Sequence, residues 1–164
     1  MGIEIERKFL VKNNFWKASA NNGTDFKQAY LTSGGPCSVR VRKEGNKANL
    51  NIKSATPGII RQEFEYSIPL DEAEELLSLF CSTAVTKKRY EVDYAGKTWE
   101  IDVFAGDNNG LIVAEIELNR PDEGFELPPW AGSEVSNEIR YYNTELARHP
   151  FCTWENSQWE GDSD

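Results

Sequence analysis

The chain has 164 residues, which suits one domain with a sizeable core. Hydrophobic residues make up 39% of it and charged residues 27%, a composition typical of globular rather than disordered proteins. The formal net charge of −9 argues against a general nucleic-acid binder, because that role needs a basic surface. It would also repel anions at long range, so any anion site must be a local cluster of Lys and Arg.

The sequence also indicates the compartment. No apolar run approaches the roughly 20 residues that a membrane span needs, and the charged segment 3–6 leaves no room for a signal peptide. The three cysteines, Cys37, Cys81 and Cys152, are an odd number without metal-site spacing, so they are expected to be reduced thiols. We therefore expect a cytoplasmic protein with neither a membrane nor a nucleic acid as partner.

Alternation of apolar and charged residues predicts strands along most of the chain. The pattern begins at residues 3–9, where Ile3 and Ile5 point one way and Glu4 and Glu6 the other. The same pattern recurs at residues 39–42, 50–53, 63–65, 87–91, 99–103 and 115–117. Clusters of Gly and Asn between these segments supply turns.

Helical pattern is confined to three segments. Residues 13–20 predict a short helix, and residues 69–80 a clearer one with Asp71 as a possible cap. Residues 136–149 predict a third helix with Ser136 as a possible cap and Pro150 beyond its end. We expect one domain over residues 1–150 and an acidic C-terminal tail over residues 151–164.

The charged faces of the strands carry pairs of like charge at positions i and i+2. Such neighbours lie about 7 Å apart and repel by roughly 2 kcal/mol at an effective dielectric near 20. The pairs are Glu4/Glu6, Arg40/Arg42, Glu63/Glu65, Lys87/Arg89 and Glu115/Glu117. A half-solvated sheet with ion-pair ladders remains an alternative, but a closed barrel with a charged lumen explains the pairs better.

A barrel of this kind has its apolar faces outside, where other elements must cover them. Three helices are few for that task, so we expect a homodimer. The fold class is therefore α+β: an antiparallel barrel with a charged lumen, covered outside by a few helices and a second subunit.

The charged side chains on the lumen face form two sets. The basic set exceeds what one phosphate needs and suits a polyphosphate; it comprises Lys8, Arg40, Arg42, Lys53, Lys87 and Arg89. The acidic set suits hard divalent cations such as Mg²⁺ or Mn²⁺; it comprises Glu4, Glu6, Glu63, Glu65, Asp102, Glu115 and Glu117, with Glu100 on the same face. The sequence has no Gly-rich phosphate loop and no HExxH motif, which leaves phosphoryl transfer to water assisted by two metal ions.

These residues resemble the opening signature and later blocks of the CYTH domain, also called the triphosphate tunnel metalloenzymes. Glu4-Ile5-Glu6-Arg7-Lys8 is similar to the ExExK signature. The later blocks are Gln28–Leu31, Val39–Arg42, Ile52-Lys53, Glu63–Glu65, Lys87–Tyr90, Trp99–Phe104, Ala114–Leu118 and Glu134–Asn143. The resemblance is to the bacterial branch; it covers residues 2 to 150 and implies an eight-stranded tunnel that hydrolyses triphosphates with Mg²⁺ or Mn²⁺.

The resemblance also assigns roles to residues. It implies that Glu4, Glu6, Glu115 and Glu117 hold metal, with Asp102 joining the ion that activates water. Glu63 and Glu65 would be metal ligands or partners that orient the basic residues. The residues implied to grip phosphate are Lys8, Arg40, Arg42, Lys53, Lys87 and Arg89, and the catalytic group is Glu4, Glu6, Lys8, Asp102 and Glu117. Asn51, Ser136 and Asn137-Glu138 depart from the family pattern.

Three functions are compatible with this pattern. The first is hydrolysis of inorganic tripolyphosphate to diphosphate and phosphate, favoured by excess phosphate-binding charge without a base-recognition motif. The second is a class IV-type adenylate cyclase or a thiamine or nucleoside triphosphatase, which needs an organic-group pocket that Trp16, Tyr30 or Trp130 could supply. The third is a polyphosphate-binding module without turnover, which the full set of carboxylates disfavours.

Overall fold

The computed structural model describes residues 2–155. The strands in this part of the chain are β1 (Gly2–Val11), β2 (Thr24–Thr32), β3 (Cys37–Glu44), β4 (Lys47–Ser54), β5 (Ile60–Ser67), β6 (Val85–Tyr94), β7 (Lys97–Phe104), β8 (Ile112–Leu118) and β9 (Ala131–Glu134). The helices are α1 (Leu70–Phe80) and α2 (Asn143–Arg148), and the short 3-10 turns are η1 (Phe15–Ser19), η2 (Gly106–Asn108), η3 (Ile139–Tyr141) and η4 (Phe151–Thr153).

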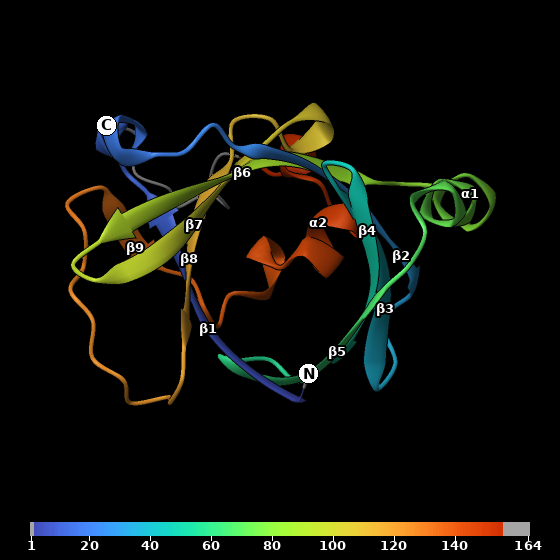
Figure 1. Ribbon diagram of the computed structural model, residues 1–164, viewed down its shortest axis with the longest axis horizontal. Coiled ribbons are helices and arrows are strands. Elements are labelled where there is room, and N and C mark those ends of the chain that lie inside the picture. Colours follow the sequence, from blue (N-terminus) through green and yellow to red (C-terminus); the bar gives the residue numbers. More distant parts are fainter. Residues whose placement is uncertain (1, 156–164) are drawn as a thin grey trace.

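Eight of the strands close into an antiparallel barrel. The sheet runs β5-β4-β3-β2-β6-β7-β8-β1, and the pairing of β5 with β1 completes the ring (Figure 1). β1 is shared: β8 lines one edge, while the other edge pairs with β5 at Gly2–Ile5 and with β9 around Phe9 and Val11. The predicted eight-stranded barrel is confirmed.

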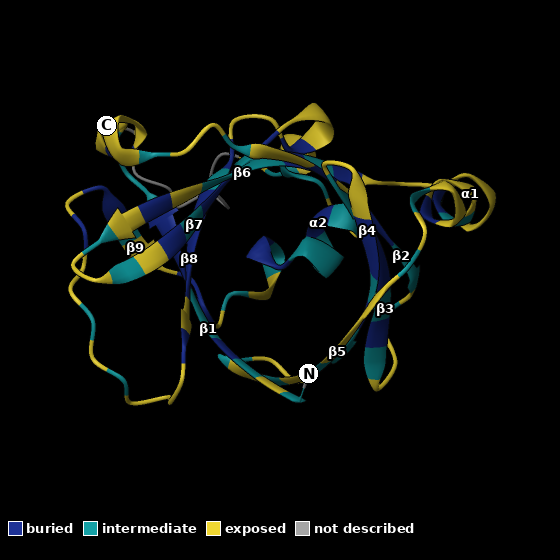
Figure 2. Cartoon of the chain, viewed as in Figure 1, coloured by how far each residue is buried: buried dark blue, intermediate teal, exposed yellow. Residues whose placement is uncertain are grey.

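The outer face of β1, β7 and β8 is covered by a layer of aromatic side chains. Trp99 lies at its centre, with ring centroids of Phe9 and Trp130 at 5.5 and 5.4 Å. Trp16 of η1 and the segment 119–131 complete this cover. Figure 2 marks the buried residues of these strands in dark blue. Irregular segments and β9 therefore do much of the covering that the sequence reading assigned to helices.

The outer face of β2, β3 and β4 is covered by α1, which lies outside the barrel wall (Figure 1). Ala73 and Leu77 of the helix pack on Ala29 and Val41 of the strands. The helix was predicted correctly, but its cap was not. Pro69 occupies the N-cap without a side-chain hydrogen bond, and Asp71 accepts a bond from the backbone N–H of Glu72 instead.

A third apolar cluster closes one end of the lumen. Leu10, Val85, Phe104 and Val113 each follow or precede a charged lumen residue by two positions, so they point into the barrel. Tyr141 and Leu146 of the C-terminal segment pack on them, and α2 lies within the ring of strands in Figure 1. Access to the charged lumen is therefore from the opposite end.

Two further helix predictions were wrong in extent. Residues 13–20 form only η1, and residues 136–149 form a 3-10 turn followed by the short α2. Ser136 is not a cap: its hydroxyl accepts a hydrogen bond from the Lys8 N–H and donates one to Glu134. Packing against the barrel end, which propensity does not encode, divides this segment.

The C-terminal end of the described chain packs against the closed end of the barrel. Phe151 and Trp154 pack against the cluster that closes the lumen, and residues 156–164 of the expected tail lie outside the described residues. Across residues 2–155, no helix has the length and apolar character to cross a membrane.

Candidate active site

The charged residues predicted from the sequence converge on one cavity inside the barrel, with a volume of about 160 Å³. The predicted residues on its wall are Glu4, Glu6, Lys8, Arg40, Arg42, Lys53, Glu63, Glu65, Lys87, Arg89, Glu115 and Glu117. Asp102 is the exception: it does not line the cavity but lies buried against Lys87 and Arg89, which do.

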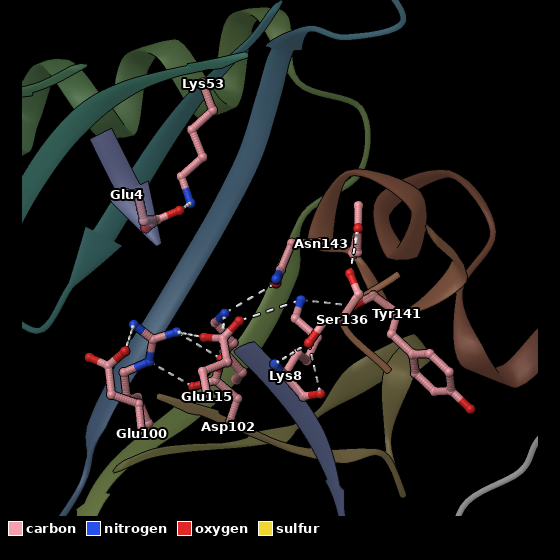
Figure 3. A network of polar contacts seen from close by, with 12 residues as sticks. Glu4, Lys8, Lys53, Glu100, Asp102, Glu115, Ser136, Tyr141 and Asn143 are labelled. Atoms are coloured by element: carbon pink, nitrogen blue, oxygen red, sulfur yellow. Dashed lines mark hydrogen bonds and ion pairs between the residues drawn. The ribbon is translucent and has the colours of Figure 1, made fainter. Parts of the chain in front are cut away.

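Asp102 is 1% exposed and is held by two cations. Its carboxylate lies 2.8 Å from the Lys87 Nζ and accepts two hydrogen bonds from Arg89, at 2.7 and 2.8 Å. Burial alone would raise the pKa of Asp102, but Arg89 and Lys87 hold it below its ordinary value. In this arrangement Asp102 anchors the two basic side chains that face the cavity (Figure 3).

Three carboxylates lie close together near Arg89. One oxygen each from Glu6, Glu100 and Glu115 lies within 4.8 Å of the others, and together they offer the hard oxygen ligands that Mg²⁺ or Mn²⁺ prefers. The sequence placed Glu100 on this face but not among the metal ligands.

The pKa values of two of these carboxylates, Glu6 and Glu115, are shifted in opposite directions. Burial raises the pKa of Glu6 well above its ordinary value, and the nearby Glu115 and Glu4 add to the rise. Burial would also raise the pKa of Glu115, but Lys8, Arg89 and Lys87 hold it well below the ordinary value. Glu6 therefore takes up a proton more readily than Glu115, and a cation bound to this group would compete with that proton.

A second acidic group surrounds Lys53. Lys53 Nζ is 3.1 Å from Glu4 and 3.7 Å from Glu63. Burial, followed by the charges of Glu4 and Glu63, raises the pKa of Glu117. Glu65 accepts a hydrogen bond from the Asn51 side chain at 3.1 Å. The acidic set thus divides into two neighbouring groups on one side of the cavity.

The basic residues differ in how strongly they are neutralised. Lys8 Nζ lies 3.4 Å from Glu115 and donates to the Tyr141 carbonyl at 3.3 Å. Lys87 donates to the Asn143 side chain, and burial lowers its pKa to about 8 although Asp102 opposes the shift. Within residues 2–155, Arg40 forms no ion pair, and its buried Nε has no hydrogen-bond partner.

Arg42 is a cation crowded by other cations. Burial, then the charges of Arg40 and Arg89, lowers its pKa to about 10. Its Nε lies 3.1 Å from a Glu44 oxygen, without the alignment of a hydrogen bond. β3, together with Arg89 of β6, therefore presents concentrated positive charge that an anion would relieve.

The cavity is also lined by residues that were not predicted from the sequence. They are Ser38, Asn51, Arg61, Tyr142, Asn143 and Thr144. Arg61 could have been found, because it lies two positions before Glu63 and shares its face. The residues at 142–144 could not, because their place depends on how the C-terminal segment closes the barrel.

The aromatic residues considered for an organic-group pocket are divided by the fold. Trp16 and Trp130 lie in the outer aromatic layer, outside the barrel. Tyr30 lines the cavity. Two of the three proposed residues are therefore on the wrong side of the barrel wall for contact with a ligand in the lumen.

Comparison with known proteins agrees with this geometry. The CYTH domain family matches residues 2–150. An inorganic triphosphatase of Acetivibrio thermocellus is 44% identical over 154 residues, covering 92% of this chain and 97% of the relative. An inorganic triphosphatase of Nitrosomonas europaea is 35% identical over 148 residues, covering 88% and 96%.

A solved crystal structure of an inorganic triphosphatase superposes with a TM-score of 0.65 at 34% identity, covering 88% of this chain and 93% of that one. The family match extends over nearly the whole barrel, including every strand that contributes to the cavity. The chain belongs to the CYTH domain family.

Proposed function

We propose that this protein hydrolyses inorganic tripolyphosphate to diphosphate and phosphate with the help of two divalent cations, Mg²⁺ or Mn²⁺. The observation that carries the proposal is the cavity itself, whose carboxylates come from β1, β5, β7 and β8 and most of whose lysines and arginines come from β3, β4 and β6. The two relatives at 44% and 35% identity are inorganic triphosphatases. A small polyanion with bound cations matches both walls at once.

The basic residues would bind the phosphates. Arg40 and Arg42 offer fork-shaped donors suited to phosphate oxygens, while Lys8, Lys53 and Lys87 act as point charges. Lys8 also lies beside Glu115, which places a positive charge at the boundary between phosphate and cation. Phosphate oxygens at Arg89 and Lys87 would compete with Asp102 for the same donors.

The acidic residues would hold the cations. The group Glu6, Glu100 and Glu115 fits one ion, because one oxygen from each lies within 4.8 Å of the others and a cation would relieve the repulsion that raises the pKa of Glu6. Glu4, Glu63 and Glu117 form the second group, with Glu65 next to it. When bound, such cations neutralise charge on the phosphates and lower the pKa of a coordinated water.

We assign Asp102 a role that depends on substrate. In the described structure it anchors Lys87 and Arg89. When phosphate takes over those two donors, the carboxylate is released and can join the cation group formed by Glu6 and Glu115. Asp102 thus belongs to the catalytic set together with Glu4, Glu6, Lys8 and Glu117.

The alternative is an enzyme for organic triphosphates, such as a cyclase or a thiamine or nucleoside triphosphatase. Tyr30 lines the cavity and favours it, but Trp16 and Trp130 lie in the outer layer. A non-catalytic polyphosphate-binding module is a weaker alternative, because the carboxylates remain together.

We also propose a homodimer. Ile3, Ile60, Phe64 and Tyr66 point outward from β1 and β5 and are 70%, 46%, 38% and 52% exposed. α1 and the aromatic layer cover other parts of the barrel's outer face. A second copy of the chain, related by a twofold axis, can bury this apolar strip against itself.

The function is tested by phosphate release from tripolyphosphate, thiamine triphosphate and ATP at equal concentration, with Mg²⁺ or Mn²⁺. We expect rapid release from tripolyphosphate and much slower release from the other two. Glu115→Gln should lower kcat at least about 100-fold, because it removes a central ligand of the cation group. Release only from an organic triphosphate, or cyclic AMP formed from ATP, would transfer the function to the alternative.

Cation binding should release protons. The raised pKa of Glu6 means that a cation must displace its proton, so cation affinity should rise as pH rises through that pKa. Calorimetric titration of Mn²⁺ in two buffers of different ionisation enthalpy measures the protons released. Glu6→Gln should reduce the release, and Glu126→Gln, an exposed carboxyl on segment 119–130, should not. Affinity that is independent of pH would contradict the assignment.

The homodimer is tested by light scattering during size-exclusion chromatography. The wild-type protein should elute with twice the mass of one chain, and Phe64→Asp should give the mass of a single chain, because a charge in the buried strip must be desolvated. Leu79→Asp is the control, since Leu79 is 68% exposed on α1, away from the strip. A monomeric wild-type protein would disprove the dimer.

A further inference from the structure

Arg61 lines the cavity, and none of the described carboxylates forms an ion pair with it. Its side chain faces the lumen from β5, and its partner across the β1–β5 pairing is Glu4. Glu4 is engaged by Lys53 instead, at 3.1 Å. Within residues 2–155, Arg61 forms no ion pair although a carboxylate stands directly opposite.

Tyr142 holds Arg61 in this position. The Arg61 guanidinium lies over the Tyr142 ring, 4.5 Å from its centroid, and the Lys8 Nζ lies 5.2 Å from the same centroid. A ring face attracts cations, and it brings these two to one place. Tyr142 therefore keeps two positive charges next to each other at the cavity wall.

Tyr142 is itself fixed by two hydrogen bonds. Its hydroxyl donates to the Ser136 carbonyl at 2.6 Å and accepts from the Gly58 N–H at 3.1 Å. The ring is 7% exposed and follows Tyr141, which packs in the cluster that closes the lumen. The platform under Arg61 is thus rigid and lies at the closed end.

The geometry leaves the guanidinium edge available to a ligand. A guanidinium stacked on a ring covers its flat face and leaves its in-plane N–H donors free, which suits phosphate oxygens. An arginine that does not pair with the carboxylate opposite it lacks the attraction of an ion pair. An anion bound in the cavity would supply that attraction.

We propose that Arg61, held on Tyr142, is a further phosphate-binding residue at the closed end of the lumen, where it takes the terminal phosphate of the triphosphate. Tyr142 is the positioning residue. The inference rests on the proposed function for the identity of the anion. A terminal phosphate has the most non-bridging oxygens, and the closed end has no outlet for a group attached to it, so this subsite recognises an unesterified phosphate.

Binding of tripolyphosphate by calorimetry in the presence of EDTA, which prevents turnover, tests this subsite. We expect Arg61→Gln to raise the Kd at least about 10-fold, which corresponds to about 1.4 kcal/mol, and Arg61→Lys to give an intermediate value. Arg120→Gln is the matched control, because it removes the same charge from an exposed side chain. An Arg61→Gln Kd equal to that of the control would overturn the proposal.

Tyr142 is tested by a pair of variants. Tyr142→Phe keeps the ring but removes the two hydrogen bonds that fix it, so its Kd should rise less than that of Tyr142→Leu, which should approach the Kd of Arg61→Gln. With Mg²⁺ present, the Arg61→Gln loss should appear in KM with kcat changed less than threefold. Equal Kd values for Tyr142→Leu and Tyr142→Phe would remove the positioning role.

The outcomes separate this inference from the proposed function. Wild-type protein that binds tripolyphosphate through Arg61 but releases no phosphate refutes the proposed function and keeps the subsite. Turnover by the wild type together with an unchanged Kd for Arg61→Gln refutes the subsite alone. Absence of tripolyphosphate binding by the wild type in EDTA, together with no phosphate release in Mg²⁺, refutes both.

Discussion

The buried ion pairs of Asp102 and Glu115 with Lys87, Arg89 and Lys8 are the interactions on which the rest of this barrel depends. Inside the lumen they join β7 to β6, β8 to β1, and β8 to β6. Removing one partner of such a pair leaves a buried charge and costs about 3–5 kcal/mol. A chain that places like charges on single strands therefore has to bring acidic and basic strands together, and closing the sheet into a barrel does so.

The same constraint determines the outside of the molecule and the access to its interior. Since the lumen takes the charged side chains, the apolar side chains of each strand point outward, and α1, η1 and segment 119–131 cover them. At one end the lumen face itself becomes apolar, and Tyr141 and Leu146 close it. A ligand therefore enters from the other end with one of its own ends leading. This favours a linear polyanion over a bulky one.

Much of the barrel could be predicted from alternation alone, because lumen and outer positions follow from a period of two. That pattern placed Glu4, Lys53 and Glu115 correctly, and it also pointed to Arg61, which was overlooked. It could not show that Asp102 is engaged by Arg89 and Lys87, since this depends on distances between strands. The break in the expected 136–149 helix was likewise beyond the pattern, because the barrel end and not helix propensity shapes that segment.

The most direct test is a crystal structure of the protein grown with Mn²⁺ and a non-hydrolysable triphosphate analogue, with anomalous scattering recorded to locate manganese. The proposed arrangement predicts a manganese peak bounded by Glu6, Glu100 and Glu115, with the analogue lying along Arg40 and Arg42. It also predicts that Lys87 and Arg89 contact phosphate. Manganese outside the lumen, or an analogue bound away from the arginines, would contradict the division of the cavity into a cation side and a phosphate side.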